Sequence, residues 1–138
     1  MIIKSESKQT TISKKVSLKG VGLHTGQEVE VNFLPADIDN GYTFRRIDLE
    51  GMPVIKADAN LVTNTQRGTC LEKNGVTIQT CEHVLAALVG LEIDNAIIEL
   101  STSEPPIMDG SSKYFIEALE RAGTKELEAY REVFVVKD

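Results

Sequence analysis

Alternating apolar and polar residues predict strands in the first half of the chain. Such alternation is typical of strands with one buried face, and it occurs at residues 10–18, 28–34, 42–47 and 54–57. The glycine-rich segment 20–26 predicts a turn that joins the first two strands into a hairpin. Pro53, directly before the fourth segment, predicts an edge strand, because proline has no backbone N–H to donate to a neighbour.

The second half begins with a clear hairpin signal. Asn74-Gly75 separates the strand-like segments 69–72 and 76–79, and this residue pair accepts the positive φ angles of a tight turn. The apolar segment 96–100 predicts a strand deep in the sheet. Residues 124–130 are interpreted as a polar connector before a last strand at 131–136. The uneven, polar segment 58–68 is a candidate active-site loop.

Two segments have the pattern of helices. Residues 84–89 are apolar on all faces and predict a short buried helix, with Thr80 as its N-cap and Gly90 in a left-handed C-cap. A second helix is expected up to Arg121, followed by Gly123, with Asp109 or Ser111 as its cap. Its core-facing stripe has helical spacing and consists of Phe115, Ile116, Leu119 and Ala122.

These elements predict an α+β fold. Several antiparallel strands precede two helices that flank one buried strand, which indicates a two-layer sandwich with both helices packed on one face of a mostly antiparallel sheet, as in the βα domains of ribosomal proteins. A chain of 138 residues with 41% hydrophobic content can bury one full core. We expect a domain at 1–126 and, at 127–138, a connector and first strand leading to a further domain.

Charge and composition exclude several function classes. The net charge of −6 argues against a nucleic-acid surface, including that of a ribosomal-type nucleic-acid binder of similar topology. No apolar run reaches the roughly 20 residues that span a bilayer, and the first residues do not resemble a signal peptide. Cytoplasmic location is therefore the default expectation. Cys70 and Cys81 are expected as reduced thiols, since their spacing matches no zinc knuckle.

The chemistry centres on Glu82 and His83, the only acidic or basic side chains between Lys73 and Glu92. At a helix N-terminus the dipole favours an ionised carboxylate and a neutral imidazole. Those are the forms required of a general base and a zinc ligand. The alternative is that the glutamate only caps a core helix and the histidine is a structural hydrogen-bonding group, in a noncatalytic interaction domain. The dipeptide alone leaves both readings open.

Six motifs together resemble a known family. The segments match in order and at plausible intervals, from about residue 8 to the end of the chain: GVGLHTG (20–26), FRR (44–46), TCL (69–71), EHVL (82–85), GLEIDNA (90–96) and PIMDGS (106–111). They are similar to the N-terminal half of the UDP-3-O-acyl-N-acetylglucosamine deacetylases, zinc amidases of lipid A biosynthesis in Gram-negative bacteria. Cys81 and Pro105 depart from the pattern, in place of an apolar and a branched aliphatic residue.

The resemblance implies two similar α/β domains with the active site between them. It implies that His83 is one zinc ligand and Glu82 the general base, with the other ligands in a second domain. Secondary candidates for substrate binding or support of the site are His24, Arg67, Gly68, Cys70 and Asp109. Some relatives carry a fused hydroxyacyl carrier-protein dehydratase. The 138-residue chain alone is expected to be inactive, to bind zinc weakly or not at all, and to self-associate through its bare domain interface.

Overall fold

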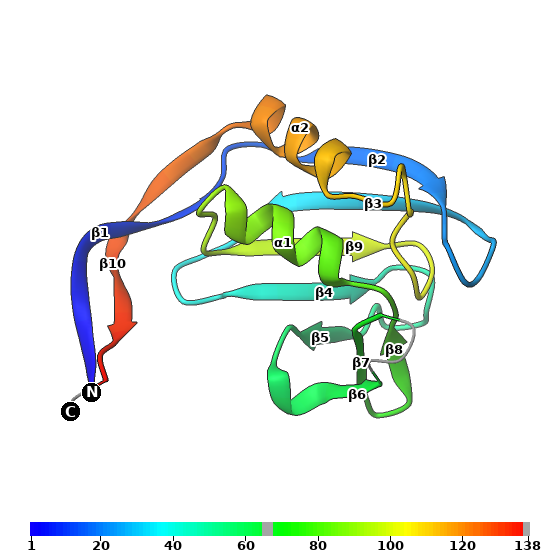
Figure 1. Ribbon diagram of the computed structural model, residues 1–138, viewed down its shortest axis with the longest axis horizontal. Coiled ribbons are helices and arrows are strands. Elements are labelled where there is room, and N and C mark those ends of the chain that lie inside the picture. Colours follow the sequence, from blue (N-terminus) through cyan, green and yellow to red (C-terminus); the bar gives the residue numbers. More distant parts are fainter. Residues whose placement is uncertain (65–67, 137–138) are drawn as a thin grey trace.

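The structure is a computed structural model that describes residues 1–64 and 68–136 (Figure 1). In chain order its elements are β1 (Ile2–Ile12), β2 (Val16–Val21), β3 (Glu28–Pro35), β4 (Tyr42–Arg46), β5 (Val54–Lys56), the 3-10 helix η1 (Ala59–Leu61), β6 (Val62–Asn64), β7 (Cys70–Lys73), β8 (Val76–Ile78), α1 (Glu82–Gly90), β9 (Ala96–Leu100), α2 (Lys113–Ala122) and β10 (Thr124–Phe134).

A five-stranded sheet forms one layer of the body, with the order β2-β3-β9-β4-β5. Its pairs are antiparallel except β4 with β9, which are parallel. Both helices lie on the same face of this sheet (Figure 1). The predicted α+β two-layer architecture is therefore confirmed, as are the β2–β3 hairpin, the central position of β9 and the edge position of β5.

The core lies between this sheet face and the helices. In β3, Val29, Val31 and Phe33 alternate toward the helices and are 0–3% exposed. The Phe33 ring meets Phe115 of α2 edge to face, with centroids 6.2 Å apart and planes at 72°. Burying an aromatic or branched side chain contributes about 1.5–3 kcal/mol, so these contacts hold α2 on the sheet. The predicted α2 stripe is confirmed, with Ile116 only partly buried against the core.

The ends of α1 differ from those predicted. The N-cap is Cys81 and makes no side-chain cap hydrogen bond, while the predicted cap, Thr80, has a φ of +52° and donates its hydroxyl to Glu104. At the other end Gly90 is still helical, and Glu92 takes the left-handed conformation with a φ of +56°. The prediction was wrong at both ends because a tertiary partner captures the threonine, and because the turn closes two residues later than expected.

The N-cap predicted for α2 was also wrong. Ser112 occupies that position, and its hydroxyl donates 2.9 Å to the carbonyl oxygen of His83 in α1. Asp109 and Ser111 lie earlier and hydrogen bond to each other. The start of α2 is thus anchored on the first turn of α1, a contact that the local sequence could not reveal.

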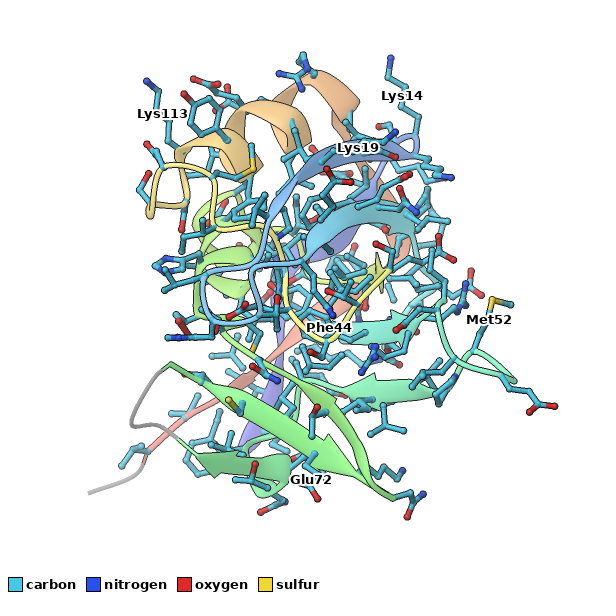
Figure 2. All side chains as sticks on the ribbon, turned by 90° about the vertical axis from the view of Figure 1, so that its right-hand side faces the viewer. Lys14, Lys19, Phe44, Met52, Glu72 and Lys113 are labelled. Carbon is cyan, nitrogen blue, oxygen red and sulfur yellow. The ribbon has the colours of Figure 1, made fainter. Side chains whose placement is uncertain are left out.

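A small sheet, ordered β6-β7-β8, lies beside the edge strand β5, at the end of the molecule marked by Glu72 in Figure 2. The predicted turn is confirmed, with φ angles of +52° at Asn74 and +79° at Gly75. The buried Arg46 of β4 links the two sheets by donating 2.9 Å to the carbonyl oxygen of Thr77. Segment 58–68 was interpreted as a candidate active-site loop. Its first part instead forms η1 and β6, and Arg67 lies outside the described residues.

β1 and β10 pair as an antiparallel ribbon that extends from the body (Figure 1). Two predictions are wrong here. The predicted strand 10–18 is interrupted at residues 13–15, so it belongs partly to β1 and partly to β2. The expected connector 124–130 is part of strand β10. The break coincides with a 2.9 Å bond from the Ser13 N–H to the Gly123 carbonyl oxygen. Pairing between opposite ends of a chain leaves little local signal. In the part of the chain described, no helix is long and apolar enough to cross a membrane.

Candidate active site

The first turn of α1 brings Glu82 and His83 side by side at the surface. They are the first two residues of the helix, and their side chains are 34% and 33% exposed. His83 Nε2 lies 3.8 Å from Glu82 Oε1. Successive residues on a helix point about 100° apart. The short distance between these two atoms therefore means that both side chains bend toward the same point at the helix end. A single bound group can therefore reach an imidazole and a carboxylate together.

Backbone from the segment before β7 holds the Glu82 carboxylate in place. Its Oε2 accepts a 2.7 Å hydrogen bond from the N–H of Thr69. Gly68 packs against the same group: a Cβ at residue 68 would lie 2.9 Å from Oε1 and 3.3 Å from Oε2, and the φ of +113° there also favours glycine. One oxygen is thus fixed by an amide, and the other is the oxygen nearer His83.

Cys81 supports this junction from inside the core. Its N–H and its thiol both donate to the carbonyl oxygen of Thr69, at 3.1 and 3.3 Å. Burial, and then the nearby charge of Glu82, raise the pKa of the Cys81 thiol to about 12. A thiol with that pKa stays protonated near neutral pH and offers no thiolate to a metal. Cys70 is half-buried, and its sulfur lies 3.9 Å from the carbonyl oxygen of Gly68.

Sequence reasoning missed Glu104, a carboxylate that is 0% exposed. Its Oε1 accepts from the N–H groups of His24 (2.9 Å) and Thr25 (3.0 Å), and its Oε2 accepts from the Thr80 hydroxyl (2.6 Å). Burial alone would raise the pKa of Glu104, but these hydrogen bonds outweigh it and lower the pKa. A signal was present, since Glu104 is the only charged residue between Glu99 and Asp109 and two prolines follow it.

The remaining predicted residues lie in different surroundings. His24 is exposed on the turn between β2 and β3, and its own amide is bound to Glu104. Asp109 is exposed and accepts from the N–H (3.0 Å) and hydroxyl (2.7 Å) of Ser111, and these bonds lower its pKa. The structure therefore brings Gly68 to Glu82 and ties the His24 turn, through Glu104, to Thr80, two residues before α1, whereas the hydrogen bonds of Asp109 remain within its own turn.

The sequence matches one protein family along almost its whole length. Residues 9–138 match the model of the UDP-3-O-acyl N-acetylglycosamine deacetylases, LpxC. The chain belongs to this deacetylase family. Similar proteins include a bifunctional enzyme LpxC/FabZ of Bacteroides thetaiotaomicron, 48% identical over 130 residues, and one of Porphyromonas gingivalis, 44% identical over the same length; each alignment covers 94% of this chain.

A relative from Xanthomonas oryzae pv. oryzae is described as a UDP-3-O-acyl-N-acetylglucosamine deacetylase. It is 48% identical over 120 residues, which cover 87% of this chain. The chain spans 28% of the length of the two bifunctional relatives and 40% of that of the Xanthomonas deacetylase. The similarity therefore establishes the family of this chain, and it does not by itself establish the activity of a complete protein.

The donors near α1 can supply part of a metal site. Among residues 1–64 and 68–136, the deacetylase domain has no group of three His, Cys, Asp or Glu side chains that could hold a metal ion. His83 nevertheless has the donor chemistry of a zinc ligand, with a partly exposed Nε2 next to a carboxylate. The arrangement fits one metal ligand and one neighbouring base, and by itself it offers too few donors for a tightly bound metal ion.

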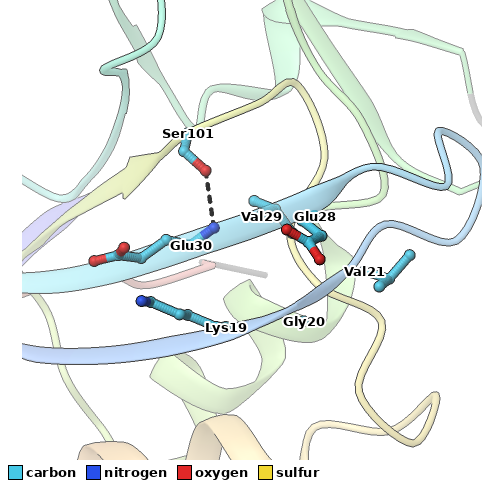
Figure 3. A pocket seen from close by; sticks show the side chains of 7 residues that line it. All are labelled: Lys19, Gly20, Val21, Glu28, Val29, Glu30 and Ser101. Atoms are coloured by element: carbon cyan, nitrogen blue, oxygen red, sulfur yellow. Dashed lines mark hydrogen bonds between the residues drawn. The ribbon is translucent and has the colours of Figure 1, made fainter.

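A separate hollow of about 480 Å³ lies on the β2–β3 hairpin of the deacetylase domain (Figure 3). The N–H of Glu30 donates 2.8 Å to the Ser101 hydroxyl at its wall. Neither Glu82 nor His83 contributes to its lining, which consists of Lys19, Gly20, Val21, Glu28, Val29, Glu30 and Ser101. The hollow is therefore separate from the Glu82–His83 site.

Proposed function

We propose that this chain is part of a zinc-dependent deacetylase that hydrolyses the acetamide of UDP-3-O-acyl-N-acetylglucosamine in lipid A biosynthesis. The observation that carries the proposal is the Glu82–His83 pair, 3.8 Å apart and partly exposed at the start of α1. The relatives support it, since those of matching name are 48% identical over 120 residues. A cytoplasmic location in a Gram-negative bacterium follows from that activity, because the substrate is a sugar nucleotide and the product leads to lipid A.

Each residue of the pair has a distinct role in the proposal. His83 would hold the zinc ion through an imidazole nitrogen, and the bound zinc would act as a Lewis acid that polarises the amide carbonyl and the attacking water. Glu82 Oε1 takes the proton of that water as the water attacks the carbonyl carbon. Because Thr69 already donates to Oε2, the carboxylate cannot rotate freely, and Oε1 stays on the side of His83.

The remaining ligands are proposed to come from a second domain of the complete protein. One histidine and one glutamate leave most positions around a zinc ion to water, so this pair alone cannot hold the metal tightly. We therefore expect the isolated 138-residue chain to bind zinc weakly and to show no deacetylase activity. Deacetylation by the purified chain would contradict this partition of the site.

The deciding experiment compares zinc content and deacetylase activity of the complete gene product with those of two variants. We expect His83→Ala to lose metal together with activity. Glu82→Gln should retain metal and lower kcat by at least about 100-fold, the usual range for a lost general base. If both variants keep full activity, the pair is structural and the proposed function is wrong.

The noncatalytic alternative is less consistent with the contacts of Glu82. A capping glutamate would accept from amides of its own helix, whereas the Glu82 carboxylate accepts from Thr69, thirteen residues earlier. The alternative predicts that Glu82→Ala changes stability and not turnover. The same kinetic comparison therefore separates the two functions.

A further inference from the structure

The buried Glu104 connects two segments that are far apart in sequence. It comes from the loop after β9, and its two oxygens bind the turn after β2 on one side and the residue before Cys81 on the other. An ionised carboxylate that is 0% exposed is costly to bury unless hydrogen bonds compensate it. Glu104 has three such bonds, all between 2.6 and 3.0 Å. A buried group with this many partners fixes the relative position of the segments that it joins.

The two segments are themselves restricted where Glu104 meets them. A Cβ at Gly22 would clash with the Thr25 hydroxyl of the same turn and would lie 2.6 Å from Glu104 Oε1, so the turn approaches the carboxylate in this way only with glycine there. On the other side, Thr80 is a β-branched residue with a φ of +52°, a conformation that persists only when surrounding contacts impose it. Neighbouring backbone adds to the link, since the Gln79 N–H donates 2.7 Å to the Ser103 carbonyl oxygen.

We propose that Glu104 is a positioning residue for the Glu82–His83 site: it binds the turn that carries His24 to Thr80, and so fixes the backbone from which α1 and its two functional side chains begin. This inference rests on the proposed function for its effect on turnover. The claim that Glu104 fixes the geometry of residues 80–83 does not depend on the proposed function. Glu104 acts through Thr80, and it is not itself placed in contact with a substrate.

The test uses a matched pair of buried threonines in the complete protein. Thr80→Val keeps the shape but removes the hydroxyl that donates to Glu104, whereas Thr80→Ser keeps it. Thr11→Val, in β1, is the control. Thr11 is 0% exposed, and its hydroxyl donates a comparable 2.7 Å hydrogen bond to the Asn95 carbonyl oxygen. We expect Thr80→Val to lower kcat at least tenfold with KM changed less than threefold. Thr80→Ser should stay near wild type, and Thr11→Val should lower Tm without changing kcat.

A second readout does not depend on activity. The amide of Thr69 donates to Glu82 and not to Glu104, so it reports whether a change at Thr80 reaches the Glu82 carboxylate. Amide hydrogen exchange of Thr69, corrected for global stability, should be at least tenfold faster in Thr80→Val and unchanged in Thr11→Val. If Thr80→Val behaves like Thr11→Val in both kcat and exchange, Glu104 is only structural and the inference is overturned.

A third pair of variants approaches Glu104 from the turn and keeps the proposal testable if Thr80→Val does not fold. Gly22→Ala places a methyl group against Glu104 and against the Thr25 hydroxyl of the same turn. Gly26→Ala, at a φ of +66°, strains the backbone of that turn, but nothing lies within 4 Å of its added Cβ. Only Gly22→Ala should reproduce the kinetic and exchange effects, and equal behaviour of the two would overturn the inference. An inactive wild-type protein would instead refute the proposed function, and the exchange data would still decide the role of Glu104.

Discussion

Gly68→Ala tests how the Glu82 carboxylate is held. The added methyl carbon would lie 2.9 Å from Glu82 Oε1, about 0.5 Å inside the 3.4 Å at which ordinary contact begins. The carboxylate must move to admit it, and its 2.7 Å hydrogen bond from Thr69 is then stretched or lost. We therefore expect this substitution, which leaves His83 itself unchanged, to displace the proposed general base.

Two costs set the size of the effect. Alanine at a φ of +113° is strained by about 1–3 kcal/mol. Losing a hydrogen bond to a charged group costs about 1.5–3 kcal/mol more, so the free energy of unfolding should fall by about 2.5–6 kcal/mol in total. A catalytic group misplaced by about 1 Å commonly costs about 100-fold in rate. A shift of half that size should lower kcat by roughly tenfold or more.

The assay is deacetylation by the complete protein at a temperature at which Gly68→Ala remains folded, together with urea unfolding. Gly75→Ala is the control, since its φ of +79° imposes strain but nothing lies within 4 Å of the added Cβ. We expect the control to lose about 1–2 kcal/mol of stability and no activity per folded molecule. If Gly68→Ala also keeps its full kcat, the contact between Gly68 and Glu82 does not position the base.

Three further predictions concern other parts of the chain. A thiol reagent at pH 8 should label Cys70 in the native protein faster than Cys81, whose pKa of about 12 leaves it protonated; peptide mass spectrometry reports both. Asp48→Asn should lower Tm at pH 7, because the hydrogen bond from Arg46 lowers the pKa of Asp48 in the folded protein. The stabilisation exists above about pH 4 and is lost as the pH falls through that lowered pKa. Equal Tm values of the wild type and the variant at pH 7 would refute this prediction. Phe115→Ala should cost about 3–5 kcal/mol in urea unfolding, and a loss below about 1 kcal/mol would contradict its core role.

The sequence predicted the elements whose signals are local. The β7–β8 hairpin was identifiable from Asn74-Gly75, because few other residue pairs accept two consecutive positive φ angles. The stripe of α2 was identifiable because apolar residues at helical spacing must face a core. The Glu82–His83 pair was identifiable because acidic and basic side chains are rare in so apolar a segment. In each case the relevant residues lie within one turn or one helix.

Long-range partners decided the rest. The β1–β10 ribbon was missed because it pairs the two ends of the chain through mostly polar strands. Thr80 was expected to cap α1, but its hydroxyl is used by Glu104, twenty-four residues later.

Composition and periodicity thus determined the layers, the main hairpins and the residue types available for catalysis, because these follow from burial and local backbone geometry. Only the tertiary structure decided which amide holds Glu82 and which buried carboxylate fixes the start of its helix. A hydrogen bond between distant segments depends on the folded path of the whole chain, and no short pattern of residues encodes it.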